Sequence, residues 1–217
     1  MRLTLLLTAA LVGGFTASTQ VAASHEAHAA AAAATAPSSA KVVATRDALR
    51  GLWKGHVVAV RKVVVAAIAK DAAAQTKAEA EAVSNAHAIA GTIEPYYGAA
   101  ARDQLFTLLA GHYGAVKAYL EASLAKDAKR ESAATDQITV NAEAIATLLS
   151  GANPNWSKDA LNELLLAHGG HHIGQIQQLI AKDAKSEADT WKAMTAHMDI
   201  IADALADGLA KQFPAKF

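Results

Sequence analysis

Apolar residues recur every three or four positions along most of the chain, which is the period of one helix face, and strand-like alternation is almost absent. Asp47, Asp103 and Asp159 each open a long apolar stripe, at the end of a helix where a negative charge is favourable. The pattern predicts an all-α fold. The three long stripes consist of Leu49, Leu52, Trp53, His56, Val60, Val63 and Ile68, then Leu105, Leu108, Leu109, His112, Val116, Leu120 and Leu124, then Leu161, Leu164, Leu165, His168, His172, Ile176 and Leu179.

The sequence matches itself in three copies at one constant spacing, without gaps. Ala-Lys-Asp-Ala recurs at 69–72, 125–128 and 181–184, where we expect a turn between two helices. Pro-Tyr-Tyr-Gly at 95–98 and the segment 151–156 are breakers between the copies. We therefore expect a six-helix antiparallel bundle built from three 56-residue helical-hairpin repeats, at about 43–98, 99–154 and 155–217.

The first residues have the order of an export signal. Arg2 precedes an apolar run from Leu3 to Phe15, and small residues follow. We expect a signal peptide at 1–23, with cleavage after Ala23 or after Ala29, and a flexible Ala/Pro/Ser linker at 24–42. No later stretch is long and uncharged enough to span a bilayer. The mature protein is then periplasmic or extracellular, without a transmembrane anchor.

Composition excludes several kinds of partner and site. Lys+Arg and Asp+Glu both number 20 in the 217 residues, so the formal charge is zero, and we expect no nucleic-acid partner. Cysteine is absent, which excludes disulfides and thiolate metal sites. The partners we consider are a cell-envelope protein or a second copy of the chain.

Polar residues within the apolar stripes predict internal pairs. His56 and Asn85 lie almost equally far before and after Asp71, so a hairpin that folds near Asp71 brings the two to one level. The same arithmetic pairs His112 with Asn141, and His168 with His197. Buried polar groups need partners, so our first interpretation is that an asparagine amide oxygen accepts from each imidazole in a structural clip.

The third copy gains histidines and suggests a metal site instead. His168, His171 and His172 share one helix face, and the residue opposite them is His197. Imidazoles suit zinc, copper or nickel, so these four residues are candidate ligands. If the three hairpins close around an axis, His56, His112 and His168 converge instead, which is the lower-ranked arrangement.

Catalytic motifs are missing from the sequence. It has no His-Glu-x-x-His, no phosphate-binding glycine loop and no nucleophile elbow, and the histidines of the third copy have no carboxylate among them. We therefore favour a non-enzymatic, exported bundle with a candidate transition-metal site. The alternatives are a structural or interaction module of the cell envelope with clips only, and a small-molecule binder between hairpins. Aromatic residues for such a pocket are Trp53, Trp156, Trp191, Tyr96 and Tyr97.

Three stretches resemble an uncharacterised family of bacterial helical proteins. They are Leu-Trp-Lys-Gly-His-Val at 52–57, Asn-Pro-Asn-Trp at 153–156 and Gln-Phe-Pro-Ala-Lys-Phe at 212–217. Members of the family often continue the first motif with Trp-Thr-Arg, whereas this chain has Ala59, Val60 and Arg61. The resemblance implies a helical fold and carries over no activity, cofactor or partner.

Overall fold

The computed structural model describes residues 39–217. The expected signal peptide and the expected linker as far as residue 38 lie outside the described residues. Six α-helices and no strand occur within residues 39–217, which confirms the all-α prediction. The helices are α2 (Ala40–Ala69), α3 (Ala72–Gly91), α4 (Glu94–Ala125), α5 (Ala128–Ala152), α6 (Lys158–Ala181) and α7 (Ala184–Gln212), and a short 3-10 turn, η1 (Pro214–Lys216), follows them.

The three Lys-Asp segments form turns with the same geometry. Lys70, Lys126 and Lys182 end α2, α4 and α6 in the left-handed region, with φ of 58°, 55° and 59°. The aspartate that follows each lysine caps the next helix by accepting from the backbone N–H three residues on. The left-handed residue reverses the chain and the aspartate restarts it, so each segment closes an antiparallel pair of helices.

The other connections are less regular. Helix α4 begins at Glu94 with Pro95 in its first turn, and the backbone leaves helical geometry at Gly98, where φ is +82°. The expected breaker at 95–98 is therefore a helical turn followed by a kink. Ser39 caps α2 by accepting from Val42 N, so helix begins inside the stretch expected to be linker up to residue 42.

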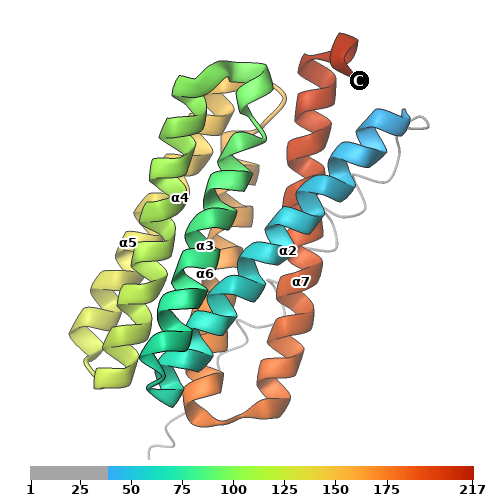
Figure 1. Ribbon diagram of the computed structural model, residues 1–217. Helices are drawn as coiled ribbons and strands as arrows, with labels where there is room; N and C mark the ends of the chain where they lie inside the picture. The colour runs from blue at the N-terminus through green and yellow to red at the C-terminus, as the bar shows by residue number, and fades with distance from the viewer. Residues whose placement is uncertain (1–38) are drawn as a thin grey trace, which may run out of the picture. The chain divides into compact units, whose positions relative to one another are not determined.

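The helices form a ring in which every second one also lies near the axis. Each helix contacts its neighbours in sequence, and the last helix, α7, contacts the first, α2. Helices α2, α4 and α6 also contact one another, so they surround the axis of the bundle. Figure 1 shows the three Lys-Asp turns at one end and the connections α3–α4 and α5–α6 at the other. None of the helices between residues 39 and 217 is long and apolar enough to cross a membrane.

A ladder of ion pairs between α2 and α7 holds the ring closed. Arg46 pairs with Asp207, Arg50 with Asp203, Lys54 with Asp199 and Arg61 with Glu187. Lone exposed ion pairs contribute about 0–1 kcal/mol each, but a ladder of partly buried pairs fixes which helices meet and in what register. This ladder brings the first stripe to the same axis as the second and third.

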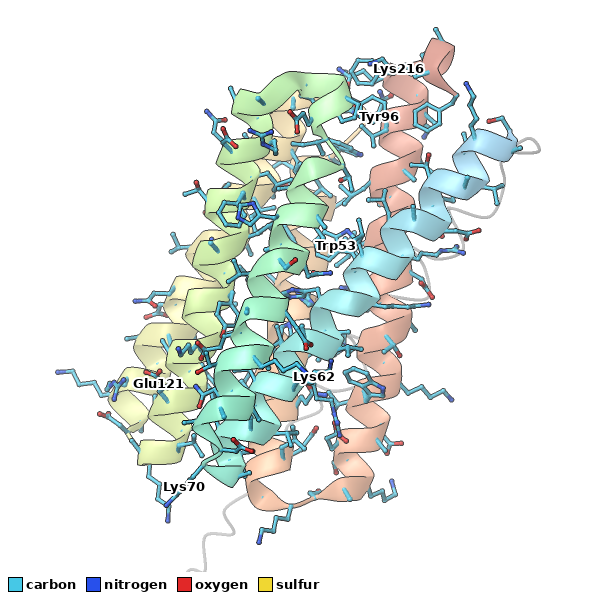
Figure 2. All side chains as sticks on the ribbon, viewed as in Figure 1. Trp53, Lys62, Lys70, Tyr96, Glu121 and Lys216 are labelled. Carbon is cyan, nitrogen blue, oxygen red and sulfur yellow. The ribbon has the colours of Figure 1, made fainter. Side chains whose placement is uncertain are left out.

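The interior consists of two hydrophobic clusters with a polar layer between them. One cluster contains Leu49, Trp53, Leu105, Leu109 and their neighbours, and it lies toward the α3–α4 end. The other contains Val60, Val63, Val116, Leu120 and Ile176, and it lies toward the Lys-Asp turns. Trp53 lies at mid-height in Figure 2, between Tyr96 and Lys216 at one end and Lys70 at the other.

Candidate metal centre

Four histidines meet in the polar layer. His56 comes from α2, His112 from α4, and His168 and His172 from α6, one helical turn apart. All four are buried, with His168 and His172 each 1% exposed. One nitrogen from each ring can be chosen so that all four lie within 4.8 Å of one another. Because these positions recur along the stripes of the three helices at the axis, closing the ring brings them together.

The rings are packed against one another. The centroids of His168 and His172 are 4.5 Å apart, and the centroid of His56 lies 5.4 Å from that of His168 and 5.6 Å from that of His172. His112 stacks on His168 at 5.3 Å. The Nε2 atoms of His168 and His172 are 3.2 Å apart. Zinc–nitrogen bonds of 2.0–2.1 Å place tetrahedral ligand atoms about 3.3 Å apart, so this pair already has the spacing of two ligands.

The third helix pair does not gather its own histidines as expected. His168 and His172 belong to the layer, whereas His171 and His197 face each other with ring centroids 5.3 Å apart and are outside the four-histidine group. His197 Nε2 donates to the carbonyl oxygen of Leu164 at 2.8 Å. The lower-ranked arrangement, in which His56, His112 and His168 converge, matches the observed grouping, and His172 adds a fourth ring.

The clips differ from the prediction in their partner. Asn85 Nδ2 donates to Leu52 O and Asn141 Nδ2 donates to Leu108 O, both at 2.9 Å. The amide oxygens of both asparagines are buried and have no hydrogen-bond partner among the residues that the structure describes, so they do not accept from an imidazole. Each amide reaches the main chain one turn before the histidine, because the imidazole turns away toward the axis.

Burial keeps all four imidazoles neutral at pH 7. Burial, and then repulsion from His112, lowers the pKa of His56 from 6.5 to about 3, and burial lowers the pKa of His112 to about 4. Burial and then the neighbouring histidines hold the pKa of His168 and of His172 well below 6.5. A neutral imidazole keeps the lone pair that a metal ion needs.

Some of the histidine nitrogen atoms in the layer have no hydrogen-bond partner. His112 Nε2, His168 Nδ1 and His172 Nδ1 are buried without a hydrogen-bond partner in the described part of the chain. Leaving a buried polar atom unpaired costs about 1–3 kcal/mol. An ion coordinated by these rings would take up one lone pair on each. The donor set is all nitrogen and carries no charge, which fits zinc, copper or nickel.

A hydrogen-bonded charge pair lies one turn from the layer, on the side of the Lys-Asp turns. Arg61 Nε donates to Glu187 Oε1 at 2.8 Å, and Gln175 Nε2 donates to the same oxygen at 3.0 Å. Arg61 holds the pKa of Glu187 below its ordinary value, mainly through this hydrogen bond. The carboxylate is thus already neutralised by its own partner. Gln175 and Glu187 are buried polar residues that the sequence analysis missed. Gln175 stands where the other copies have Val63 and Tyr119, whereas Glu187 stands where they have Gln75 and Glu131.

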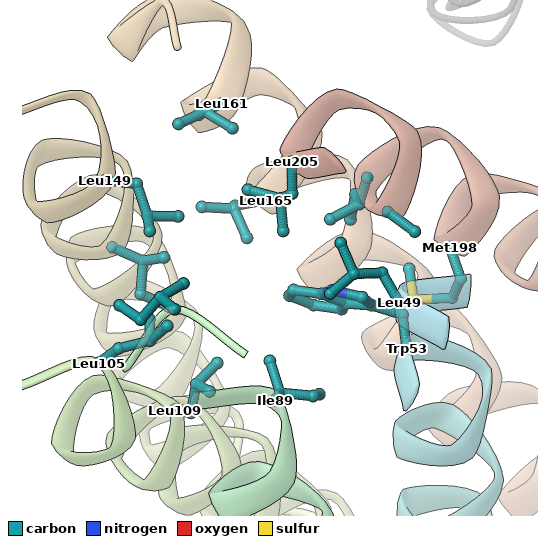
Figure 3. Close-up of a cluster of buried hydrophobic side chains, with 14 of the residues drawn as sticks. Leu49, Trp53, Ile89, Leu105, Leu109, Leu149, Leu161, Leu165, Met198 and Leu205 are labelled. Atoms are coloured by element: carbon teal, nitrogen blue, oxygen red, sulfur yellow. The ribbon is translucent and has the colours of Figure 1, made fainter. Parts of the chain in front are cut away.

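On its other side the layer borders a small cavity. This cavity of about 10 Å³ is lined by His56, His112 and His168, and by Trp53, Ala86, Ile89, Leu109, Ile145 and Leu165. A second cavity, of about 20 Å³, shares five of those lining residues and is bounded by apolar side chains farther along the axis. Figure 3 shows Trp53, Leu109, Leu165 and Ile89 around this part of the core. Trp53, which the sequence analysis considered for a pocket, therefore lines both cavities.

No family model, curated protein or solved structure matches this chain.

Proposed function

We propose that this protein binds one transition-metal ion through His56, His112, His168 and His172, with no enzymatic activity. Zinc, copper and nickel are the candidate ions, because all three accept neutral imidazole. The observation that carries the proposal is the group of four ligand nitrogens within 4.8 Å of one another, buried between two hydrophobic clusters.

A purely structural role accounts poorly for the layer. The register of the helix pairs is already set by Asn85, Asn141 and His197, which bond to main-chain carbonyls without using the four rings. Larger apolar side chains at the same places would fill the core without unpaired nitrogens. Three of the four imidazoles, His112, His168 and His172, have a buried nitrogen without a partner, which lowers the stability of the core, and an ion bound by the folded protein would add stability.

The architecture that builds the site is, in our proposal, a threefold helical-hairpin repeat. Its support is that Leu52, Leu108 and Leu164, which hold the same place in the three copies, each accept a side-chain hydrogen bond from the residue 33 positions later. The signal-like first residues support export to the periplasm or the exterior. A cell-envelope module that holds no metal is the alternative, with a partner protein or self-association as its role.

Metal content tests the proposal. Untagged protein, purified and then exposed in turn to zinc, copper and nickel, should retain about one equivalent of at least one ion after buffer exchange, as measured by elemental analysis. The His168→Ala/His172→Ala variant should retain none. The matched control is His171→Ala/His197→Asn, which changes two histidines of the same helix pair outside the layer and should keep the ion.

Protein that retains no ion, and whose melting temperature ignores all three metals, would falsify the proposal in favour of the envelope module. Equal loss of metal in both double variants would also count against it, because the ion would then be bound by the third helix pair as a whole.

A further inference from the structure

Polar side chains continue along α6 from the histidine layer toward the Lys-Asp turns. His168, His172 and Gln175 follow one another at intervals of four and three residues, so they share one face of the helix. Gln175 lies about 4.5 Å beyond His172 along the helix axis, at a rise of about 1.5 Å per residue. All three side chains are buried. Where α6 has His172 and Gln175, α2 has Val60 and Val63, so the first copy has no such polar line.

The polar line reaches solvent at an ion pair between α2 and α7. Gln175 Nε2 donates to Glu187 Oε1, and Arg61 donates to both oxygens of the same carboxylate. The Glu187 side chain is 11% exposed and the Arg61 side chain 38% exposed, so the pair lies at the boundary between solvent and core. The Arg61 guanidinium also lies over the Trp191 ring, with Cζ 5.5 Å from the ring centroid. Arg61 therefore has a second partner that holds it when the carboxylate binds another cation.

One oxygen atom on this line has no hydrogen-bond partner. Gln175 Oε1 is buried, and no donor reaches it from any residue that the structure describes. The orientation of the amide is fixed, because a carboxylate only accepts and the amide nitrogen must face Glu187. Side-chain amide oxygens, like carboxylates, are ligands for metal cations. After Glu187, Gln175 thus offers the next oxygen ligand on the way to the rings.

A buried metal site needs a route by which the ion arrives, and the other surroundings of the layer are poorly suited to a cation. The cavities toward the α3–α4 end are lined by apolar and aromatic side chains, apart from the histidines and Thr92. Toward the Lys-Asp turns, α2 and α4 contribute Val60, Val63, Val116 and Leu120. Taking a cation out of water into such surroundings costs several kcal/mol. A carboxylate and an amide oxygen reduce that cost, because they replace part of the water around the ion.

We propose, on the basis of the metal site above, that the ion enters and leaves the histidine layer along this line, with the Glu187 carboxylate as its first ligand and Gln175 Oε1 as its second. The carboxylate exchanges Arg61 for the incoming ion, and Arg61 stays over Trp191. Carboxylate oxygens bind zinc as imidazoles do. The ion then passes to His172 and the other three rings. Because the same oxygens are met in both directions, Glu187 and Gln175 govern the rates of uptake and release, whereas the rings determine the affinity.

Exchange kinetics test this route. Metal-free, untagged protein is mixed in turn with zinc(II), copper(II) and nickel(II), each supplied by a coloured indicator of weaker affinity, and uptake is followed by the loss of its colour. Transfer from the loaded protein to a stronger chelator gives the rate of release. Glu187→Gln keeps the size of the side chain and should slow both rates about tenfold or more, since a local charge changes association rates by about 10–1,000-fold. Gln175→Leu should also slow both, and in each variant Kd should change much less than either rate.

The two halves of the ion pair give effects of opposite sign. Arg61→Met removes the cation that competes for the Glu187 carboxylate, so uptake should become faster, whereas Glu187→Gln slows it. If the pair only held α2 against α7, the loss of either partner would loosen this contact and speed both uptake and release. The matched controls are Arg50→Met and Asp203→Asn, which break an ion pair between the same two helices on the other side of the layer. Both controls should exchange the ion at the native rates.

The results separate this route from the metal site itself. Faster exchange in both Glu187→Gln and Arg61→Met, or an equal change in Asp203→Asn, overturns the route, because the ion would then enter by a general opening of α2 from α7. Native rates in Glu187→Gln and Gln175→Leu overturn it as well, and the four-histidine site stands in either case. If Glu187→Gln does not fold, Gln175→Leu decides, since it leaves the ion pair in place. Protein that binds none of the three ions overturns the metal site, and the route with it.

Discussion

Two of the histidines that distinguish the third helix pair, α6–α7, from the first two differ in what they contact. Where α2 and α4 carry Val60 and Val116, α6 carries His172, and where α3 and α5 carry Asn85 and Asn141, α7 carries His197. His197 bonds to Leu164 O as the asparagines bond to Leu52 O and Leu108 O, so it preserves a main-chain clip. His172 joins the other three rings. These two histidines therefore have different consequences, which depend on the side of the helix pair that each one faces.

Lowering the pH should reduce the stability of the fold more than any other change considered, because of the four buried histidines. The unfolded chain takes up protons below pH 6.5, whereas the buried rings stay neutral down to about pH 4 for His112 and about pH 3 for His56. The unfolded state therefore binds more protons in this window, and stability is lost as the pH falls. Each ring contributes about 1.4 kcal/mol per pH unit, so four rings approach about 5 kcal/mol per unit.

Denaturant unfolding of metal-free protein between pH 7.5 and pH 5 measures this loss. His172→Val makes α6 resemble α2 and α4 and should reduce the slope of stability against pH by about a quarter. A flat profile through this range would show that the rings are not buried neutral groups.

The second effect concerns the ion itself. His172→Val removes one of four ligands and should weaken metal binding at least about tenfold, since the loss of even an outer partner of a ligand costs about 10–100-fold. Competition against a chelator of known affinity measures this. His171→Ala, one residue away on the same helix and outside the layer, is the control and should bind as the native protein does. Equal weakening by both variants would contradict the distinction between these two histidines.

Much of the fold follows from the sequence, because it rests on local signals. Helical period, the Lys-Asp turns and the levels of His56 and Asn85 depend on spacing along one or two helices. Closure of the ring depends on Arg46, Arg50 and Lys54 of the first helix finding Asp207, Asp203 and Asp199 of the last. The sequence does not show which charged residues on solvated helix faces pair with one another. It therefore predicts the convergence of His56, His112 and His168 only on the condition that the ring closes.

The sequence also does not predict which group forms the hydrogen bond with the side-chain amide in each clip. Spacing brings Asn141 to the level of His112, but whether its amide meets the ring or the main chain depends on rotation about the helix axis. Gly111 decides this, because a Cβ there would lie 3.2 Å from Asn141 Nδ2. The absent side chain lets the amide approach the backbone of α4 and reach Leu108 O. The signal in the sequence for this contact is the glycine directly before the histidine, Gly111 before His112.

Asn141→Leu tests the clip with a moderate effect. The variant loses the hydrogen bond to Leu108 O, and we expect a destabilisation of about 0.5–1.5 kcal/mol, measured by denaturant unfolding. Metal affinity and the pH slope should be unchanged, because the amide does not touch the rings. A changed pH slope would indicate that Asn141 supports His112 directly, as the sequence analysis first supposed.

The smallest expected effect comes from converting the third clip into the form of the first two. Asn85 and Asn141 lie against Gly55 and Gly111, whereas His197 is opposite Ala167 at the corresponding position. An asparagine is shorter than a histidine and must come closer to the backbone to reach Leu164 O. His197→Asn alone therefore meets the Cβ of Ala167, and Ala167→Gly makes the space.

We expect the double variant to unfold within about 1 kcal/mol of the native protein, since the hydrogen bond is kept, and the single variant to be less stable than the double. Both should bind the ion with native affinity. If His197→Asn instead lost the ion while His172→Val kept it, the assignment of one gained histidine to structure and the other to metal would be reversed.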